Sequence, residues 1–211
     1  MSTQPDPSIG DPCQHLRQHL RSATHDAHVR LNRHALLAGL TKPGYPESLY
    51  RTVLVAYYHV YRELESRIRA RLGACAHPFD YSSREKWPWL VADLAWFGEN
   101  PESRRPPAAC AVPGIVSDAA LAGVLYTLEG STLGGQVISA HLAQHQGLSA
   151  EGGGRFFSGY GAQTEARWGQ FWQWAIAVCP DHRSCREAAD AAGATFAYLE
   201  GILDHYAAVA A

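Results

Sequence analysis

The sequence lacks the cysteine pattern of a disulfide-bonded or zinc-binding protein. It has five cysteines, an odd number, and no two are spaced as C-x-x-C. Neither a disulfide framework nor a zinc cluster is therefore expected. We expect free thiols in a reducing compartment, and hence a cytoplasmic protein; the cysteines are Cys13, Cys75, Cys110, Cys179 and Cys185.

Long apolar runs and a strong net charge are also missing. No stretch approaches the roughly 18 consecutive apolar residues of a membrane span. Residues 1–12 contain prolines and a glycine but no apolar core or basic flank, so we predict neither a signal peptide nor an anchor there. With 18 basic and 20 acidic residues, the net charge of −2 favours neither nucleic acid nor a membrane surface as a partner.

What the sequence does contain is apolar residues at steps of three and four, which is typical of amphipathic helices. No stretch alternates as a strand would, so we predict an all-α fold with one helical domain over residues 14–211 and a flexible arm over residues 1–13. Ser48 and Ser117 are expected to cap two of the helices. The predicted helices cover residues 14–39, 48–73, 89–97, 117–146, 161–178 and 183–206, with loops at 75–83 and 101–113.

The longest predicted helix contains "LEGSTLGGQVI", residues 128–138, with three glycines in its interior. Each glycine costs roughly 1 kcal/mol relative to alanine in a helix. Gly130 and Gly134 lie on one face, with Gly135 beside them. One interpretation is close helix packing or a bend. The other is that a wide, flat ligand such as a porphyrin lies on the bare backbone, with Ser131 and Thr132 at its rim.

The first predicted helix offers an axial ligand for such a porphyrin in "LRSATHDAH", residues 20–28. His28 follows Ala27 of the apolar stripe, at the edge of the buried face. Asn32, one turn on, is placed to accept a hydrogen bond from His28 Nδ1, leaving Nε2 for iron. Arg21, two turns before, is placed to pair with a carboxylate. The alternatives are an ordinary boundary histidine, in a chain with 11 histidines, or a small metal ion held by His25 and His28.

Together these two segments resemble the heme oxygenase family. The resemblance implies a multi-helix bundle with a kinked distal helix, in which His28 binds heme iron and Arg21 holds a propionate. Gly130 and Gly134 then bring the distal backbone over the heme, with Gly135 next to it. Weaker similarity extends over residues 14–206. Because "EGS-x-LG" is shared with a bacterial branch that often accompanies phytochromes, the resemblance also suggests a bacterial phytochrome as the user of the product.

Three positions depart from the common pattern of that family. Ser131 stands where many members have an aspartate that orders the distal water, so a water chain held by carbonyls and hydroxyls is expected here. Asn32 replaces a glutamate, which predicts a less basic histidine ligand. Arg167 is the one basic residue left of a propionate-binding cluster, since Gly169 and Gln173 occupy its other positions.

The activity that the resemblance implies is oxidative cleavage of heme to biliverdin, carbon monoxide and ferrous iron, with dioxygen as the oxidant. The chain has no flavin or nicotinamide fingerprint, so electrons come from a ferredoxin or reductase. Four arginines of the second helix form either a docking face for that partner or a solvated helix face: Arg62, Arg67, Arg69 and Arg71.

Other functions remain open from the sequence alone. A non-catalytic heme carrier or sensor would keep His28 and lack the distal carboxylate. A helical thiamin-degrading enzyme would need a cysteine nucleophile such as Cys179 or Cys185 beside a carboxylate. In a purely structural helical module, the paired motifs would be coincidental.

Overall fold

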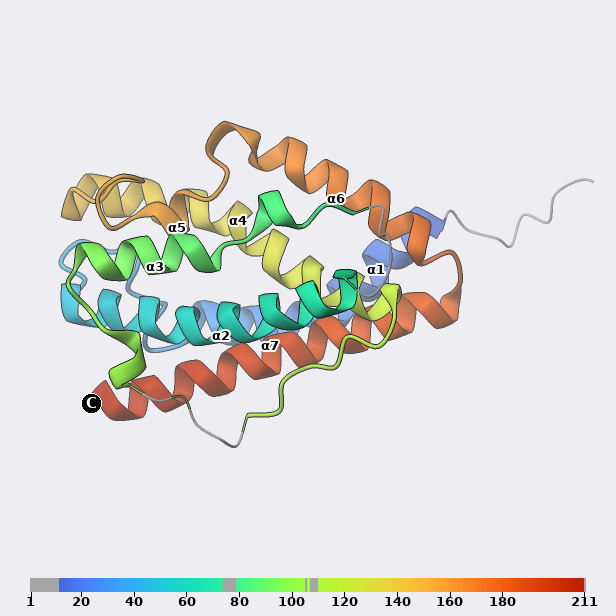
Figure 1. Ribbon diagram of the computed structural model, residues 1–211, viewed down its shortest axis with the longest axis horizontal. Coiled ribbons are helices and arrows are strands. Elements are labelled where there is room, and N and C mark those ends of the chain that lie inside the picture. Colours follow the sequence, from blue (N-terminus) through green and yellow to red (C-terminus); the bar gives the residue numbers. More distant parts are fainter. Residues whose placement is uncertain (1–11, 74–78, 105, 107–109, 211) are drawn as a thin grey trace, which may run out of the picture.

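The computed structural model describes residues 12–73, 79–104, 106 and 110–210. Over these ranges the chain is helical, with short turns and no β-strand, which confirms the all-α prediction (Figure 1). The α-helices are α1 (Pro12–Arg33), α2 (Glu47–Gly73), α3 (Trp87–Trp96), α4 (Asp118–Gln146), α5 (Arg155–Ser158), α6 (Thr164–Val178) and α7 (His182–Ala210), with 3₁₀ turns at η1 (Ser82–Arg84), η2 (Pro101–Ser103) and η3 (Gly161–Gln163).

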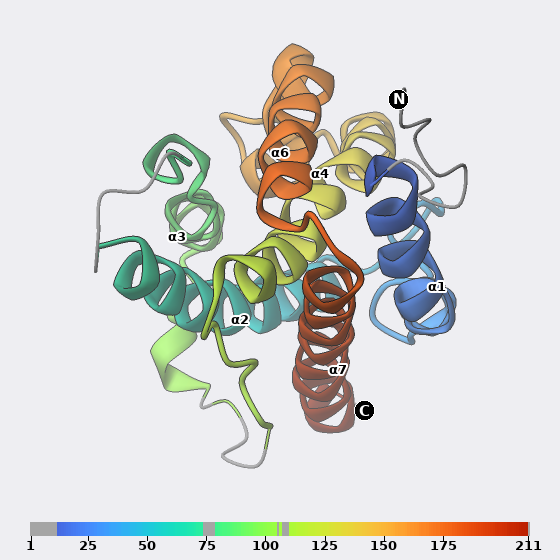
Figure 2. The same cartoon turned by 90° about the vertical axis from the view of Figure 1, so that its right-hand side faces the viewer.

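Helix α4 runs through the middle of the molecule, and α1, α2, α6 and α7 surround it (Figure 2). It is one continuous helix of 29 residues whose axis changes direction along its length (Figure 1). At 1.5 Å per residue it extends ~43 Å. Its most extensive packing is against α7. A Cβ at Gly123 would lie 2.0 Å from the Ala188 carbonyl oxygen, so this glycine lets the two backbones meet.

The ends of α4 are those that the sequence predicts. Ser117 is the N-cap, and its hydroxyl accepts a hydrogen bond of 3.0 Å from the Ala120 N–H. Gly147 ends the helix with φ of 68°, a left-handed conformation that glycine adopts without strain.

The predicted N-terminal cap of α2, Ser48, is wrong. That helix begins at Glu47, and the N–H groups of Leu49 and Tyr50 bond to the Pro46 carbonyl. Ser48 therefore lies inside the first turn.

The first helix is shorter than predicted, ending at Arg33 and not near Gly39. From His34 the chain continues in turns, with the His34 N–H bonded to the Leu31 carbonyl at 3.0 Å. The cause lies in Tyr45, whose hydroxyl donates to the Leu36 carbonyl. Its ring fills the space beside Gly39, where a Cβ would lie 2.4 Å from Tyr45 Cδ2. This contact is tertiary and leaves no periodic signal in the sequence.

The other elements differ from prediction mainly at their ends. Helix α3 starts two residues early, α6 starts at Thr164 after η3, and α7 extends to Ala210. The short α5 was not predicted. Residues 1–11 of the expected arm lie outside the described residues, whereas Pro12 and Cys13 already belong to α1. Residues 75–78 of the predicted loop at 75–83, and residues 105 and 107–109 of the one at 101–113, also lie outside them.

Candidate functional site

A cavity of about 830 Å³ lies between α1 and α4. Its volume is within the range of small-molecule and cofactor sites. The walls are largely apolar, with aromatic side chains from α2, α5, α6 and α7 completing the space between the two helices. Among the lining residues are Arg21, His25, His28, Asn32, Tyr57, Tyr61, Thr127, Gly130, Ser131, Gly134, Gly135, Phe156, Phe157, Trp168 and Phe196.

The α1 wall carries the predicted ligand, His28, whose ring packs edge-on against Phe196 with centroids 6.3 Å apart. Asn32 is next to it as predicted, but with the opposite polarity: Asn32 Nδ2 lies 3.2 Å from His28 Nδ1. The amide therefore donates to the ring, where the sequence predicted that it accepts. An imidazole that binds a metal through Nε2 carries its proton on Nδ1. The Asn32 amide would have to turn by half a rotation to serve that state.

Arg21 lies on the same wall, and the structure gives its guanidinium no ion pair among the residues that it describes. Arg30, nine residues further along α1, instead pairs with Glu200 at 2.7 Å. The charge of Arg21 is thus available to a ligand in the cavity. A carboxylate is the natural partner of a guanidinium in such a position.

The three glycines of the α4 wall do different things. A Cβ at Gly134 would meet no atom within 4 Å, so this residue presents bare backbone to open space in the cavity. At Gly130 a Cβ would be in ordinary contact with Trp168, at 3.5 Å. At Gly135 it would lie 3.0 Å from the Phe157 carbonyl oxygen, so this glycine serves the packing of α5. Gly135 therefore fits the packing interpretation of the glycine motif, whereas Gly134 leaves open space in the cavity that packing does not explain.

Hydroxyl groups line the cavity beside these glycines. Ser131 donates to the Leu128 carbonyl at 2.8 Å, so its oxygen accepts the hydrogen bond of 2.9 Å that joins it to Tyr61. Burial raises the pKa of Tyr61 above its usual range, so the phenol stays protonated. Thr127 is also a lining residue, and its buried hydroxyl has no hydrogen-bond partner among the described residues.

Arg167 is not brought to this cavity. Its Nη1 donates to Ser83 Oγ at 2.7 Å, and the guanidinium lies over the Tyr160 ring, 5.3 Å from the centroid. It lines a second, smaller cleft together with Arg155. The sequence places Arg167 correctly on α6. Its side chain, however, contacts Ser83 of η1 and Tyr160 after α5, and these contacts keep it away from the cavity.

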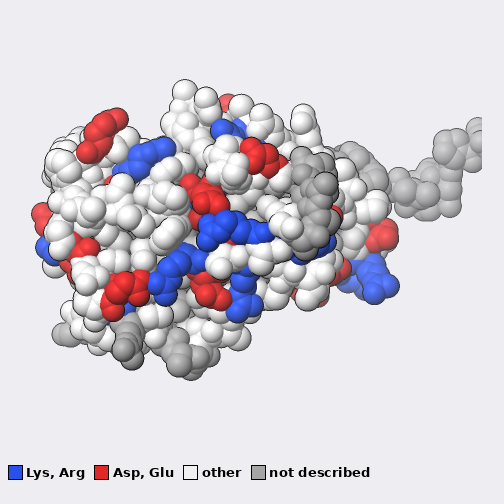
Figure 3. Space-filling model, in the orientation of Figure 1, with Lys and Arg blue, Asp and Glu red and all other residues white. Residues whose placement is uncertain are grey.

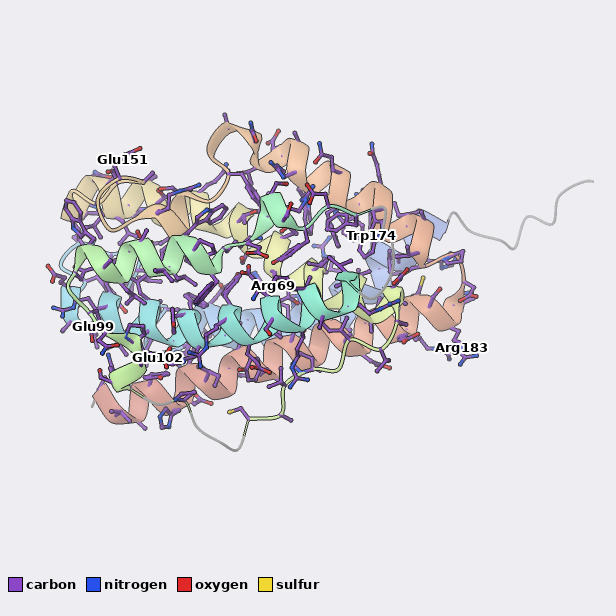
Figure 4. All side chains as sticks on the ribbon, viewed as in Figure 1. Arg69, Glu99, Glu102, Glu151, Trp174 and Arg183 are labelled. Atoms are coloured by element: carbon purple, nitrogen blue, oxygen red, sulfur yellow. The ribbon has the colours of Figure 1, made fainter. Side chains whose placement is uncertain are left out.

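The predicted arginine face of α2 is neutralised by carboxylates. Arg67 pairs with Glu63 one turn away at 2.8 Å, and Arg69 with Glu85 at 3.1 Å. Arg71 and Arg62 pair with Asp118 and Glu102. Basic and acidic side chains accordingly alternate along this side of the molecule, where Arg69 and Glu102 are marked (Figures 3 and 4). This ion pairing favours the second of the two interpretations, a solvated helix face.

A buried charged cluster that joins α4 to neighbouring segments was not predicted from the sequence. Glu129, which precedes Gly130, is only 1% exposed. It accepts hydrogen bonds from Lys86 Nζ at 2.6 Å, Arg84 Nη1 at 2.7 Å and the Tyr160 hydroxyl at 2.9 Å. We call these four residues the Glu129 cluster. The only available signal was a charged residue inside an apolar helix, because its partners come from η1, the residues before α3 and the turn after α5.

Aromatic side chains of the cavity were missed for a similar reason. Tyr57, Phe156 and Phe157 read as ordinary core residues, and in part they are: Phe156 and Phe157 are buried. Trp172 and Trp174 pack in the core, at 7% and 9% exposed, whereas Trp168 lines the cavity. An aromatic residue that packs in the core and one that lines a cavity have the same periodicity.

Within the described ranges, no helix is long and apolar enough to cross a membrane.

A search of curated proteins gave no significant sequence match. Solved structures share the fold: heme oxygenase from Leptospira interrogans superposes with a TM-score of 0.72 at 19% identity, covering 90% of this chain and 98% of that one.

Two further structures agree. Heme oxygenase-1 from the cyanobacterium Synechocystis sp. PCC6803, in complex with heme, has a TM-score of 0.72 at 19% identity, covering 90% of this chain and 91% of that one. NO- and CO-bound heme oxygenase from Neisseria meningitidis has a TM-score of 0.71 at 21% identity with the same coverage. The family model for heme oxygenase matches residues 14–204, nearly the whole described chain. The protein belongs to the heme oxygenase family.

Proposed function

We propose that the protein is a heme oxygenase that cleaves heme to biliverdin, carbon monoxide and ferrous iron. The single observation that carries the proposal is that His28 of α1 and the bare backbone at Gly134 of α4 line one cavity of about 830 Å³. This geometry suits a flat ligand that needs a donor atom on one side and close contact with backbone on the other.

The residues present fit heme as the substrate. In this proposal His28 binds the iron through Nε2 with the Asn32 amide turned to accept from Nδ1, and Arg21 pairs with a propionate. Gly130 and Gly134 leave room for the porphyrin and for dioxygen, which oxidises the ring with external electrons. Gly135 supports α5, and Arg167 would reach a propionate only after leaving Ser83.

The distal hydroxyls supply what a carboxylate supplies elsewhere in the family. The hydroxyls of Tyr61 and Ser131, two lining residues of the cavity, are joined by a hydrogen bond of 2.9 Å. We propose that these groups hold the water molecules that deliver protons in the cavity. Tyr61 stays protonated at neutral pH because burial raises its pKa, so it acts as a donor.

The finer assignments belong to the proposal as well. A ferredoxin or reductase supplies the electrons, and a bacterial phytochrome of the branch that the "EGS-x-LG" segment suggests receives the bilin. A cytoplasmic location suits the free thiols of Cys110, Cys179 and Cys185. The alternative function is a heme carrier or sensor, which the uncharged hydroxyls around Ser131 favour because no carboxylate orders a distal water there.

An absorption time course separates these functions. The purified protein is mixed with one equivalent of heme and then given a reductant and air. A heme oxygenase shows a Soret band that decays into a biliverdin spectrum. His28→Ala is expected to lose the histidine-coordinated spectrum, and His145→Ala, an exposed residue of α4 outside the cavity, is the matched control. A Soret band that persists in reductant and oxygen would establish the carrier, and no heme binding would exclude both.

A further inference from the structure

We propose that the cleft between Arg155 and Arg167 is a second binding site, specific for the oxyanion group of a small metabolite such as a polycarboxylate or phosphate. The cleft has a volume of about 500 Å³ and is lined by residues of η1, α3, α5, η3 and α6. Both basic residues in the lining are arginines, and the lining contains no aspartate or glutamate. None of its residues lines the cavity between α1 and α4.

The two guanidinium groups are held in place without being neutralised. Arg155 Nη1 donates to the Gly159 carbonyl at 2.6 Å, and the guanidinium stacks over the Trp89 ring, 4.2 Å from its centroid. Arg167 donates to Ser83 at 2.7 Å and lies over the Tyr160 ring. Each guanidinium has five N–H donors, and neither forms an ion pair in the part of the chain that the structure describes. Preorganised donors of this kind favour an anion because little side-chain entropy is lost when it binds.

The acidic groups near the cleft are engaged by other donors. Asp93 accepts from the backbone N–H groups of Arg155 and Phe156, both at 2.8 Å. The Asp80 carboxylate accepts from the hydroxyls of Ser82 and Ser83, and these bonds, with a smaller effect of the Arg167 charge, lower its pKa. Glu151 accepts from Ser149 and lies at the outer edge of its loop (Figure 4). The α2 arginines show the contrast, because each of them is matched by a carboxylate.

The rest of the lining suits an oxyanion with a carbon skeleton. Trp89 and Tyr160 line the cleft and form an edge-to-face pair with centroids 5.4 Å apart. The N-terminal end of α6, a helix of 15 residues, begins beside the cleft and adds its partial positive charge. Arginine forks match carboxylate and phosphate geometry, so charge, donors and apolar surface converge on one ligand class.

Isothermal titration calorimetry of the full-length protein with citrate and with inorganic phosphate tests the site, with sodium chloride at equal ionic strength as the blank. We expect a dissociation constant below about 1 mM for at least one of the two probes. Arg155→Gln and Arg167→Gln should each weaken binding at least about tenfold. Because Trp89 lines the cleft, binding should also change the tryptophan fluorescence, and Trp89→Phe should abolish that change. Citrate binding alone would assign a carboxylate ligand, and phosphate binding alone a phosphate ligand.

Two controls keep the test decisive. Arg186→Gln, which removes an exposed arginine of α7, should bind as the wild type does. Arg21→Gln should also leave binding unchanged, whereas a loss in this variant would place the anion in the first cavity and overturn the proposal. Absence of binding to both probes, or binding that survives both cleft substitutions, would overturn it as well. Thermal unfolding of each variant shows that the fold is intact, and because the readout needs no heme, the result is independent of the proposed activity.

Discussion

The glycines of the segment at residues 128–138 have different structural roles. Gly134 and Gly135 are neighbours, yet a Cβ meets nothing at the first and the Phe157 carbonyl oxygen at 3.0 Å at the second. Gly134 therefore costs helix stability without improving protein packing. In the proposed function, this loss of helix stability is offset by heme that lies against the bare backbone of Gly134.

Gly134→Ala tests this explanation directly. In the heme-free protein the alanine should stabilise α4 by up to about 1 kcal/mol, raising the unfolding midpoint by about 2–4 °C. With heme, the added methyl group costs about 1–3 kcal/mol, which weakens binding about 5- to 150-fold. Calorimetric unfolding and heme titration measure the two effects.

Gly193→Ala is the matched control for this prediction. Gly193 lies inside α7, a Cβ there also meets nothing within 4 Å, and it does not line the cavity. This variant should gain similar stability and bind heme unchanged. Equal heme affinity in both variants would show that Gly134 does not face the ligand.

At the scale of elements, the Glu129 cluster connects α4 to segments that no periodicity links to it. Lys86 and Arg84 are 1% and 3% exposed, and both reach the Glu129 carboxylate. Arg84 also donates to the Arg167 carbonyl at 3.1 Å and to Gln170 Oε1 at 2.8 Å, both on α6. The cluster thus holds the glycine segment of α4 against α6 and η1.

Glu129→Gln should be strongly destabilising, because it leaves two buried cations without their carboxylate. Breaking a buried pair in this way typically costs about 3–5 kcal/mol. Urea unfolding followed by circular dichroism measures the loss. Glu63→Gln, which breaks the exposed pair with Arg67 on α2, should change stability by less than about 1 kcal/mol. Similar losses in both variants would argue against the cluster as a special support of α4.

For the whole molecule, the position of α1 decides whether a cavity exists at all. This helix carries His28 and Arg21, and it packs mainly against α7. Arg30 and Glu200 form a two-bond contact across that interface, at 2.7 and 2.9 Å. The hydrogen bond from Arg30 lowers the pKa of Glu200 below its usual value.

This shift predicts a direction for the pH dependence of stability. A carboxylate with a lowered pKa in the folded state contributes stability above its unfolded pKa of about 4.3, and the contribution is lost as the pH falls through the folded value. Glu200→Gln should therefore be less stable than wild type at pH 7, by under about 1 kcal/mol because Arg30 is exposed. The difference between the two proteins should shrink below pH 4 in urea unfolding. A difference that stays constant down to pH 2 would contradict the prediction.

Much of the fold follows from local signals. The Ser117 cap and the Gly147 stop of α4 are read directly from residue type, because a side-chain oxygen bonds the first free N–H groups and glycine adopts positive φ. The end of α1 is not read this way, since Tyr45 binds the Leu36 carbonyl from twelve residues beyond the last helical residue, Arg33.

The candidate site divides in the same manner. By itself the sequence determined that the chain is helical, and it placed His28 and Gly134 on two helices that line one cavity. Only the tertiary structure decided that Gly134 faces the cavity while Gly135 packs on α5, and that Arg167 turns to a second cleft. Spacing fixes where a residue lies on its own helix, but what it faces depends on how neighbouring helices cross, and contacts between distant segments set that crossing.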